Sequence, residues 1–369
     1  MSRRISVTEH IVFDGHEGWE HDGGVYRLAC GATVTAAPNG DILCHWLSGG
    51  DKEPATDNCV LMARSSDGGT TWSEPWVVIP AGEDASSLTC VYPTDDGRLI
   101  ALGAWWPSEK HYTVWRYFRM ESHDSGATWS EPERMVIYDD RATVDLPITL
   151  STGEHLHPAS FFEERPKPLT GPCEKLAFAK TEEEALAIPP GEGSEPGKFG
   201  THVHGCLTFL SRDGDVRNLE PGGEIRNRPL GLLEPSIVET SDGRIVMIMR
   251  AEWGGYLWRA ESTDKGRTWT EAWQTDIPNP TTKLFLQKLP DGRIALLHNA
   301  TGDGVGTRGS RDPLSIWISD DDLESWSIKE DVITGGQLAY PSGMIYHDKL
   351  VFSYDHNRRQ ARFVEVNID

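Results

Sequence analysis

Charged and phenolic side chains recur at one position of a repeated pattern in this sequence. Six apolar runs each turn back into a second apolar run, and Glu234 and Lys283 stand nine positions before the turn glycine of their copies. Tyr340 aligns with them in the sixth copy, and Arg250 closes the same hairpin as Glu234. Charged residues are seldom buried unless they are paired. We therefore expect a site here, in which guanidinium forks could hold a carboxylate.

Histidines form a second candidate constellation, in two H-x-H pairs at residues 155–157 and 202–204. In a strand, residues i and i+2 share a face, so each pair could bind one ligand. His157 and His204 are candidates for substrate contact or general acid/base work, and hydrogen-bonded structural roles are the alternative. Four histidines together could hold a metal ion, but no carboxylate spacing supports this, and we expect neither a metal nor a cofactor.

The elements that position these residues are six hairpins. Five of them turn at an N-G, D-G or T-G pair, which are hairpin signals, and the sixth turns at His347-Asp348. Both open ends of a hairpin lie at the same edge of its sheet. The segment 354–359 ends the last hairpin and is therefore a further candidate to face the site. The hairpins occupy residues 32–46, 86–106, 145–162, 234–250, 283–299 and 340–357.

A second repeat, S-x-D-x-G-x-T-W, follows several of the hairpins. It occurs in full at residues 65–72, 122–129 and 262–269, and in weaker form from Ser211 and from Ser319. The Asp can bond the backbone downstream of it and the Gly can adopt positive φ, so the repeat predicts a tight turn between strands. Its Trp can fill the gap between neighbouring sheets.

Together the two repeats predict an all-β, six-bladed β-propeller that forms one domain over residues 1–369. Residues 163–200, rich in Pro, Glu and Gly, form an insertion in the third blade, with one helical turn expected at 182–187. Residues 5–14 are expected to close the ring as a strand of the last blade. A β-sandwich, the competing architecture, does not predict six evenly spaced hairpins.

Composition restricts the partners. The formal net charge is −22, which disfavours nucleic acid and anionic membranes as partners. The six cysteines show no CxxC pair, and the first residues lack an apolar signal-peptide core, so we expect reduced thiols and a cytoplasmic location. No stretch approaches a transmembrane span. The oligomeric state is left open.

The S-x-D-x-G-x-T-W turns are Asp-boxes, or BNR repeats, and from about residue 27 to 367 the chain resembles the sialidase superfamily. The resemblance implies that Tyr340, in Ala339-Tyr340-Pro341-Ser342, is the nucleophile and that Glu234 assists it. It also implies that Arg250 and Arg311 bind the substrate carboxylate. A phenol with a pKa of about 10 is a poor nucleophile at neutral pH, so a carboxylate base beside it is physically sensible.

Two positions depart from the family pattern. The family's first arginine aligns with Cys30, so Arg27 or Lys283 is expected to supply the third cation. The acid/base carboxyl lies in the loop 49–57, where Asp51 and Asp57 are both candidates and we prefer Asp57.

The resemblance implies a sialidase-like, exo-acting glycoside hydrolase that removes a terminal carboxylate-bearing sugar from an oligosaccharide or glycoconjugate by a retaining mechanism. Two alternatives stay open. One is a polysaccharide lyase on a uronic acid, with Tyr340 or a histidine removing the C5 proton. The other is a non-catalytic carbohydrate-binding propeller, because the boxes specify the fold more strongly than the reaction.

Overall fold

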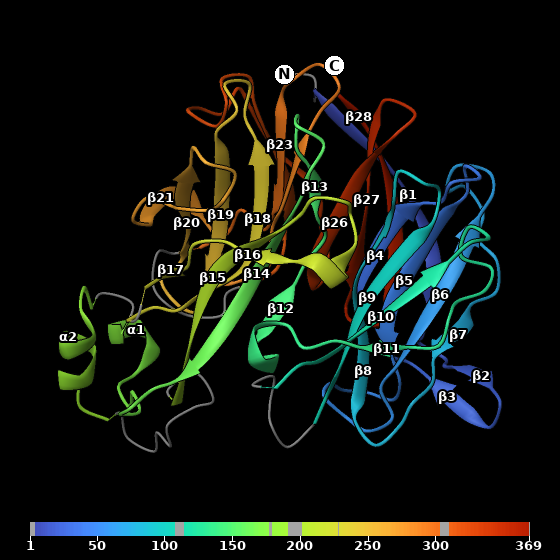
Figure 1. Cartoon of the computed structure of the whole chain (residues 1–369), viewed down its shortest axis with the longest axis horizontal. Helices are drawn as coiled ribbons and strands as arrows, with labels where there is room; N and C mark the ends of the chain where they lie inside the picture. Colours follow the sequence, from blue (N-terminus) through green and yellow to red (C-terminus); the bar gives the residue numbers. More distant parts are fainter. Residues whose placement is uncertain are drawn as a thin grey trace.

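The computed structural model describes residues 4–107, 114–176, 179–190, 201–227, 229–302 and 310–368. Six antiparallel sheets follow one another around a ring, and the ends of the chain lie side by side at the top of the view (Figure 1). The predicted all-β, six-bladed propeller is confirmed.

The first three blades contain the strands that follow the N-terminal segment. The first blade consists of β4 (Cys30–Ala36), β5 (Ile42–Ser48), β6 (Cys59–Ser65) and β7 (Trp76–Ile79). The second consists of β8 (Ala85–Pro93), β9 (Leu99–Trp106), β10 (Arg116–Ser122) and β11 (Glu133–Arg134). The third consists of β12 (Ala142–Val144), β13 (Ile148–Thr149), β14 (His155–Glu164), β15 (His202–Ser211), β16 (Glu220–Pro221) and β17 (Ile225–Arg226).

The other three blades complete the ring. The fourth consists of β18 (Leu232–Glu239), β19 (Ile245–Ala251), β20 (Tyr256–Ser262) and β21 (Trp273–Pro278). The fifth consists of β22 (Phe285–Lys288), β23 (Ile294–His298), β24 (Leu314–Ser319) and β25 (Ile328–Ile333). The sixth consists of β26 (Leu338–Tyr346), β27 (Lys349–His356), β28 (Gln360–Ile368) and β1 (Ile5–Asp14).

The ring closes through the pairing of the first strand with the last. β1 runs antiparallel to β28, with a register from Ile5 opposite Ile368 to Asp14 opposite Gln360. The expected closing strand at residues 5–14 is therefore confirmed. Between β1 and the first blade, β2 (Trp19–His21) and β3 (Gly24–Tyr26) form a small hairpin at the lower right of the view (Figure 1).

Bulges interrupt the innermost strands at equivalent places. The register shifts between Cys30 and Thr33 in β4, and comparable shifts occur in β8, β18 and β26. Gly31, Glu234 and Tyr340 lie within such bulges and have φ of 65°, 48° and 55°. A β-bulge redirects a side chain, and positive φ in a residue other than glycine costs energy. The bulges therefore orient Glu234 and Tyr340 at the cost of backbone strain.

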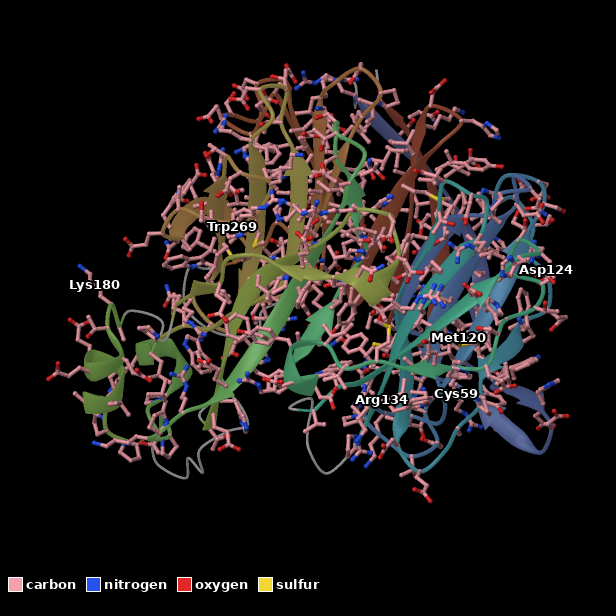
Figure 2. All side chains as sticks on the ribbon, in the orientation of Figure 1. Cys59, Met120, Asp124, Arg134, Lys180 and Trp269 are labelled. Carbon is pink, nitrogen blue, oxygen red and sulfur yellow. The ribbon has the colours of Figure 1, made fainter. Side chains whose placement is uncertain are left out.

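The box turns share one hydrogen-bond pattern. In the first box, Ser65 Oγ donates to Asp67 Oδ1 at 2.8 Å, and Asp67 accepts from both the backbone N and the Oγ1 of Thr71. The turns from Ser122, Ser262 and Ser319 repeat these contacts, with Ser325 in place of the threonine in the last. The weaker copy at Ser211 keeps only part of the pattern. Figure 2 labels Asp124 and Trp269, from two of these turns, toward opposite edges of the ring.

The hydrophobic core is divided among the junctions between blades. One cluster joins Leu43 to Leu99 across the first and second blades, and another joins Phe363 to Cys44 across the sixth and first. A cavity of about 400 Å³ lies on the ring axis. It is lined by one or more residues of each inner strand, including Val34, Tyr92, Ile148, Ile237, Leu286 and Met344.

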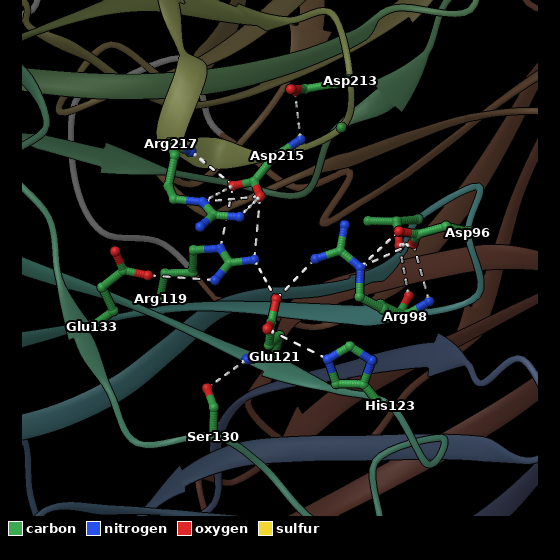
Figure 3. Close-up of polar contacts among 12 residues, drawn as sticks. Asp96, Arg98, Arg119, Glu121, His123, Ser130, Glu133, Asp213, Asp215 and Arg217 are labelled. Atoms are coloured by element: carbon green, nitrogen blue, oxygen red, sulfur yellow. Dashed lines mark hydrogen bonds and ion pairs between the residues drawn. The ribbon is translucent and has the colours of Figure 1, made fainter.

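A partly buried ion-pair cluster joins the second blade to the third (Figure 3). Glu121 Oε2 accepts from Arg98 Nη1 at 2.8 Å and from Arg119 Nη2 at 2.6 Å, and the same Arg119 nitrogen donates to Asp215 Oδ2 at 3.2 Å. The hydrogen bond from Arg119 is the main reason that the pKa of Glu121 falls to about 2. The cluster therefore stays ionised and cross-links the two blades over most of the pH range.

The third blade carries the expected insertion between β14 and β15. Its described part contains α1 (Cys173–Leu176) and α2 (Glu182–Ala187), at the lower left of the view (Figure 1). The helical turn expected at residues 182–187 is confirmed, and Thr181 caps it by accepting a hydrogen bond from Glu184 N. Two short 3-10 helices complete the described elements of the third blade, at Tyr138–Asp140 and Val216–Asn218.

The cysteines for which the structure describes side chains are free thiols. All of them are buried; they are Cys30, Cys44, Cys59, Cys90 and Cys206. None of the helices in the described ranges is both long enough and apolar enough to cross a lipid bilayer.

Closure of the ring makes the first box turn sensitive to one added methyl group. A Cβ at Gly69 would lie 2.1 Å from Phe363 Cε1 of the last blade, whereas a Cβ at Gly97 would meet no atom within 4 Å. Both glycines have positive φ, so alanine costs each about 1 kcal/mol through the backbone. Overpacking adds about 1–3 kcal/mol for Gly69→Ala alone. Urea unfolding should show the larger loss for Gly69→Ala, and equal losses in the two variants would contradict tight packing at this junction.

Candidate functional site

Tyr340 and Glu234 interact electrostatically, from the sixth and fourth blades. Both side chains are partly buried at bulges of β26 and β18. Burial raises the pKa of the Tyr340 phenol above its ordinary value, and the negative charge of Glu234 raises it further. The phenol is therefore neutral at physiological pH and needs a base if it is to act as a nucleophile.

Glu234 is suited to be that base because two cations keep it ionised. Arg250 Nη1 donates to Glu234 Oε2 at 2.5 Å, and Glu234 N donates to Ser160 Oγ at 2.7 Å. Burial raises the pKa of Glu234, but the charges of Arg250 and Lys283 outweigh it and leave the pKa below its ordinary value. Glu234 is therefore ionised at neutral pH, which is the state in which a carboxylate can accept a proton.

Arg250 and Arg311 approach the site from two blades. Arg250 Nε donates to Thr281 Oγ1 at 3.3 Å, and this hydroxyl donates to the carbonyl of Ala251 at 2.7 Å. The guanidinium carbon of Arg311 lies 5.6 Å from the centre of the Tyr340 ring. The amide of Asn299 donates to the carbonyl of Arg311 at 2.8 Å and so fixes the segment that carries it. The structure thus brings together four of the residues singled out in the sequence.

Lys283 lies beside this group but has a partner of its own. Its Nζ is 2.6 Å from Asp145 Oδ1, between β12 and β13 of the third blade. Burial raises the pKa of Asp145, and the charge of Lys283 opposes that rise. The pair is nearly neutral as a unit, although Lys283 still lowers the pKa of Glu234.

Arg27 packs against the N-terminal segment. Its backbone N donates to the carbonyl of Gly49 at 2.8 Å, and its guanidinium carbon lies 3.5 Å from where a Cβ on Gly18 would be. No contact of Arg27 with Tyr340, Arg250 or Arg311 occurs among the described residues. Its proposed role as a third cation therefore stays a prediction without geometric support.

The loop between β5 and β6 holds three carboxylates in different settings. Asp57, the preferred acid/base, is exposed, and its Oδ2 accepts from Gly50 N at 3.1 Å. Asp51 Oδ1 is 2.7 Å from Arg359 Nη2 and is 71% exposed. Glu53 is only 13% exposed and pairs with Arg358. The sequence contained no signal for Glu53, because nothing in a loop without periodicity distinguishes it from Asp51 and Asp57.

The histidine pairs lie apart. In the β14–β15 ladder, His157 is opposite Phe209 and His204 is opposite Phe162, so the two pairs occupy opposite ends of the ladder. His157 is fully buried, and burial lowers its pKa to about 3. His204 Nδ1 is hydrogen-bonded to Glu252 Oε1. A joint four-histidine metal site is excluded by this register, and no metal-ligand cluster occurs within the described ranges.

Asp355, at the end of β27, is a buried carboxyl beside the site. It is fully buried, and neither carboxylate oxygen receives a hydrogen bond from another side chain in the part of the protein that the structure describes. Burial raises its pKa to about 7, against the opposing charges of Arg358 and Arg311. The sequence placed Asp355 at the end of a hairpin but contained no signal for its burial.

The raised pKa of Asp355 should make stability fall as pH rises. The carboxyl of the unfolded chain loses its proton near pH 4, whereas the folded one keeps it until about pH 7. Each increase in pH between these two values therefore favours the unfolded state. The total effect is at most about 4 kcal/mol. Unfolding titrations in urea at several pH values should show Asp355→Asn losing this slope and gaining stability above pH 7. The exposed Asp95→Asn should keep the wild-type slope, and an unchanged slope in Asp355→Asn would contradict the assignment.

The comparisons with known proteins agree with this fold. A family model described as a BNR repeat-like domain matches residues 40–352. A sialidase from Micromonospora viridifaciens is 24% identical over 368 residues, which cover 91% of this chain and 50% of that protein. The chain thus spans about half the length of this curated relative.

Solved structures show the same architecture at low sequence identity. A protein of unknown function from Dyadobacter fermentans has a TM-score of 0.71 at 14% identity, covering 99% of this chain and 100% of its own. A Hadza microbial sialidase has a TM-score of 0.71 at 16% identity, covering 98% and 68%. A Trypanosoma rangeli sialidase in complex with 2,3-difluorosialic acid has a TM-score of 0.64 at 16% identity, covering 97% and 58%.

These likenesses confirm that the fold is a sialidase-type BNR propeller. The family model covers both the box turns and most of the strands that carry the site. On that match, together with the repeated box geometry, the chain belongs to the family of proteins with a BNR repeat-like domain.

Proposed function

We propose that this protein is a sialidase-like, exo-acting glycoside hydrolase that removes a terminal carboxylate-bearing sugar with retention of configuration. One observation carries the proposal: a neutral phenol, Tyr340, lies within the field of an ionised carboxylate, Glu234, with Arg250 and Arg311 beside them. The relatives named as sialidases support the class of reaction.

In the first step, the phenolic oxygen of Tyr340 attacks the anomeric carbon while its proton passes to Glu234. The bond from the anomeric carbon to the leaving oxygen breaks, and a carboxyl of the loop 49–57 protonates that oxygen. Asp57 remains our assignment for this acid/base, since it is exposed where an incoming glycan could reach it. In the second step the same carboxylate takes a proton from water, which displaces the tyrosine, and Glu234 returns the proton to the phenolate.

A neutral nucleophile suits an anionic substrate. A carboxylate nucleophile would repel the carboxylate of the sugar, whereas a phenol does not. The guanidinium forks of Arg250 and Arg311 can each bind a carboxylate through two parallel hydrogen bonds. The substrate partner we propose is accordingly an oligosaccharide or glycoconjugate that ends in an acidic sugar.

The two alternatives have less support in the geometry. A lyase would use Tyr340 or a histidine as the base for the C5 proton, but His157 is fully buried and electrically neutral. A non-catalytic propeller would not require strained backbone at both Glu234 and Tyr340, with φ of 48° and 55°. These features favour the hydrolase over a lyase that uses His157 and over a non-catalytic propeller.

The nucleophile can be tested by trapping it. Incubation with 2,3-difluorosialic acid should add one sugar mass to the intact protein, located on Tyr340 by peptide mapping. Tyr340→Phe should form no adduct, and its kcat should fall by about 10³-fold or more. Glu234→Gln should lower kcat by about 10²–10⁴-fold, because its amide cannot accept the phenolic proton. Tyr346→Phe, at the far end of the same strand, should keep wild-type kcat and serves as the matched control.

The products separate the three functions. Mass spectrometry of an acidic oligosaccharide pool should show fragments that have gained one water, with the released sugar initially in the configuration of the substrate. Fragments without added water and with new ultraviolet absorbance would instead establish a lyase. Binding of acidic sugars without any cleavage would establish the non-catalytic alternative.

A further inference from the structure

The tight turn between β27 and β28 carries a charged residue into the junction of the sixth and first blades. Asn357 and Arg358 have φ of 55° and 56°, as at the central positions of a type I′ turn, and lie in the three-residue loop between His356 and its partner Gln360. The carbonyl of Arg358 accepts from Ala29 N at 3.1 Å, and Asn357 N donates to the carbonyl of Gln337 at 2.8 Å. Arg358 is therefore held in an uncommon backbone conformation by contacts on both sides.

The guanidinium of Arg358 lies against Cys30. Its Nη2 is 3.3 Å from Cys30 Sγ and also donates to Glu53 Oε1. Burial raises the pKa of the Cys30 thiol well above its ordinary value, so the thiol is uncharged. Cys30 is the position at which the family pattern has an arginine. The small, neutral side chain leaves that space to a guanidinium that comes from another blade.

Three guanidiniums consequently interact with the Tyr340 phenol. The guanidinium carbon of Arg311 lies 5.6 Å from the centre of the Tyr340 ring, and Arg250 and Arg358 are both within electrostatic range of the phenolic oxygen, whose ionised form would attract them. Arg250 belongs to the fourth blade, Arg311 precedes the last strands of the fifth, and Arg358 belongs to the sixth. Guanidinium groups from three blades thus lie near the phenol.

One donor of Arg358 lacks a hydrogen-bond acceptor among the residues that the structure describes. Nε of Arg358 is buried and makes no hydrogen bond with any described residue. Leaving a charged donor buried and unsatisfied is costly, unless a ligand supplies the acceptor. Glu53 accepts a hydrogen bond from Nη2 and orients the planar guanidinium, and the Arg358 side chain is 37% exposed, so an anion from solution can reach it.

We propose that Arg358 supplies the third cation of the carboxylate-binding site, replacing from the sixth blade the arginine that is absent at Cys30. Glu53 is then a positioning residue for Arg358. This inference rests on the proposed function, because the anion is taken to be the carboxylate of the substrate sugar. It assigns the third cation to Arg358 in place of Arg27 or Lys283.

The neighbouring residue provides a matched control. Arg359 belongs to the same turn, but its Nη2 contacts Asp51 Oδ1 at 2.7 Å, and Asp51 is 71% exposed. Arg358→Ala and Arg359→Ala therefore each remove one positive charge from adjacent positions, and each breaks one ion pair with a carboxylate of the loop 49–57. Only the first removes a cation that interacts with Tyr340.

The test compares an acid with its ester. Titration calorimetry with N-acetylneuraminic acid and with its methyl ester measures how much each variant depends on the carboxylate. We expect Arg358→Ala to weaken binding of the acid at least about tenfold, as for loss of one charge-assisted hydrogen bond, and to leave the ester nearly unchanged. Arg358→Lys should retain part of the preference, and Arg359→Ala should bind both within about twofold of wild type.

A variant that moves the arginine back to position 30 gives the most specific test of this assignment. In Cys30→Arg combined with Arg358→Ala, the guanidinium returns to the first blade, and the preference for acid over ester should recover in part. Kinetics should show Arg358→Ala raising KM for an acidic substrate more than it lowers kcat. Glu53→Gln should act in the same direction but more weakly, because it loosens the guanidinium without removing it.

The outcomes separate this inference from the proposed function. Cleavage by the wild type together with an unchanged acid preference in Arg358→Ala would overturn the assignment and leave the hydrolase intact. Equal loss of acid and ester binding, with a lowered unfolding temperature, would show a structural role and would also overturn it. A wild-type protein that neither binds the acid nor cleaves an acidic oligosaccharide would overturn both the assignment of Arg358 and the proposed function.

Discussion

The pairing of β1 with β28 is the constraint on which the rest of the ring depends. A propeller blade leaves edges exposed unless a neighbouring strand covers them, and here the N-terminal strand completes the sheet that the C-terminal strands begin. This closure brings the sixth blade against the first, where Ser353 Oγ donates to the carbonyl of Ala32 at 2.8 Å. The same junction carries the contact of Arg358 with Cys30 and Glu53, so one side of the candidate site exists only in the closed ring.

Three carboxylates at the site lie in ion pairs with cations. Glu234 pairs with Arg250, Asp145 with Lys283 and Glu53 with Arg358, and each pair offsets the cost of removing ions from water. Asp355 forms no ion pair with any described residue, and burial raises its pKa to about 7. Because burial and the charge of Glu234 keep Tyr340 uncharged, the site can hold several cations near the phenol without creating a charged nucleophile. Glu234 and Tyr340 both lie in β-bulges and have positive φ, so the backbone that positions these two side chains is strained.

The parts of the fold that were predictable from sequence are those with local causes. A box turn is closed by bonds between residues no more than four apart, such as Thr71 N to Asp67 Oδ1, so its sequence is sufficient to recognise it. The position of Glu234 was predictable because the distance from a hairpin turn to the sheet edge is fixed by the strand repeat. The environments of Glu53 and Arg358 were not predictable in this way, since they depend on which loop of one blade meets which turn of another. The same holds for the burial of His157 and for the separation of the two histidine pairs, which follow from a strand register that residue spacing does not contain.

The junction between blades also explains how a site can keep its charge when one residue of a family pattern is missing. Read along the chain, Cys30 indicates the loss of an arginine. In space, the guanidinium of Arg358 occupies the volume next to the thiol, and the type I′ turn that carries it is anchored to Ala29, the residue before Cys30. Because electrostatic attraction depends on distance and not on the blade of origin, an anion near Tyr340 experiences the Arg358 charge whichever strand supplies it. The cost of this arrangement is a non-glycine residue at positive φ, and the backbone hydrogen bonds and the Glu53 ion pair at the closed junction are what offset it.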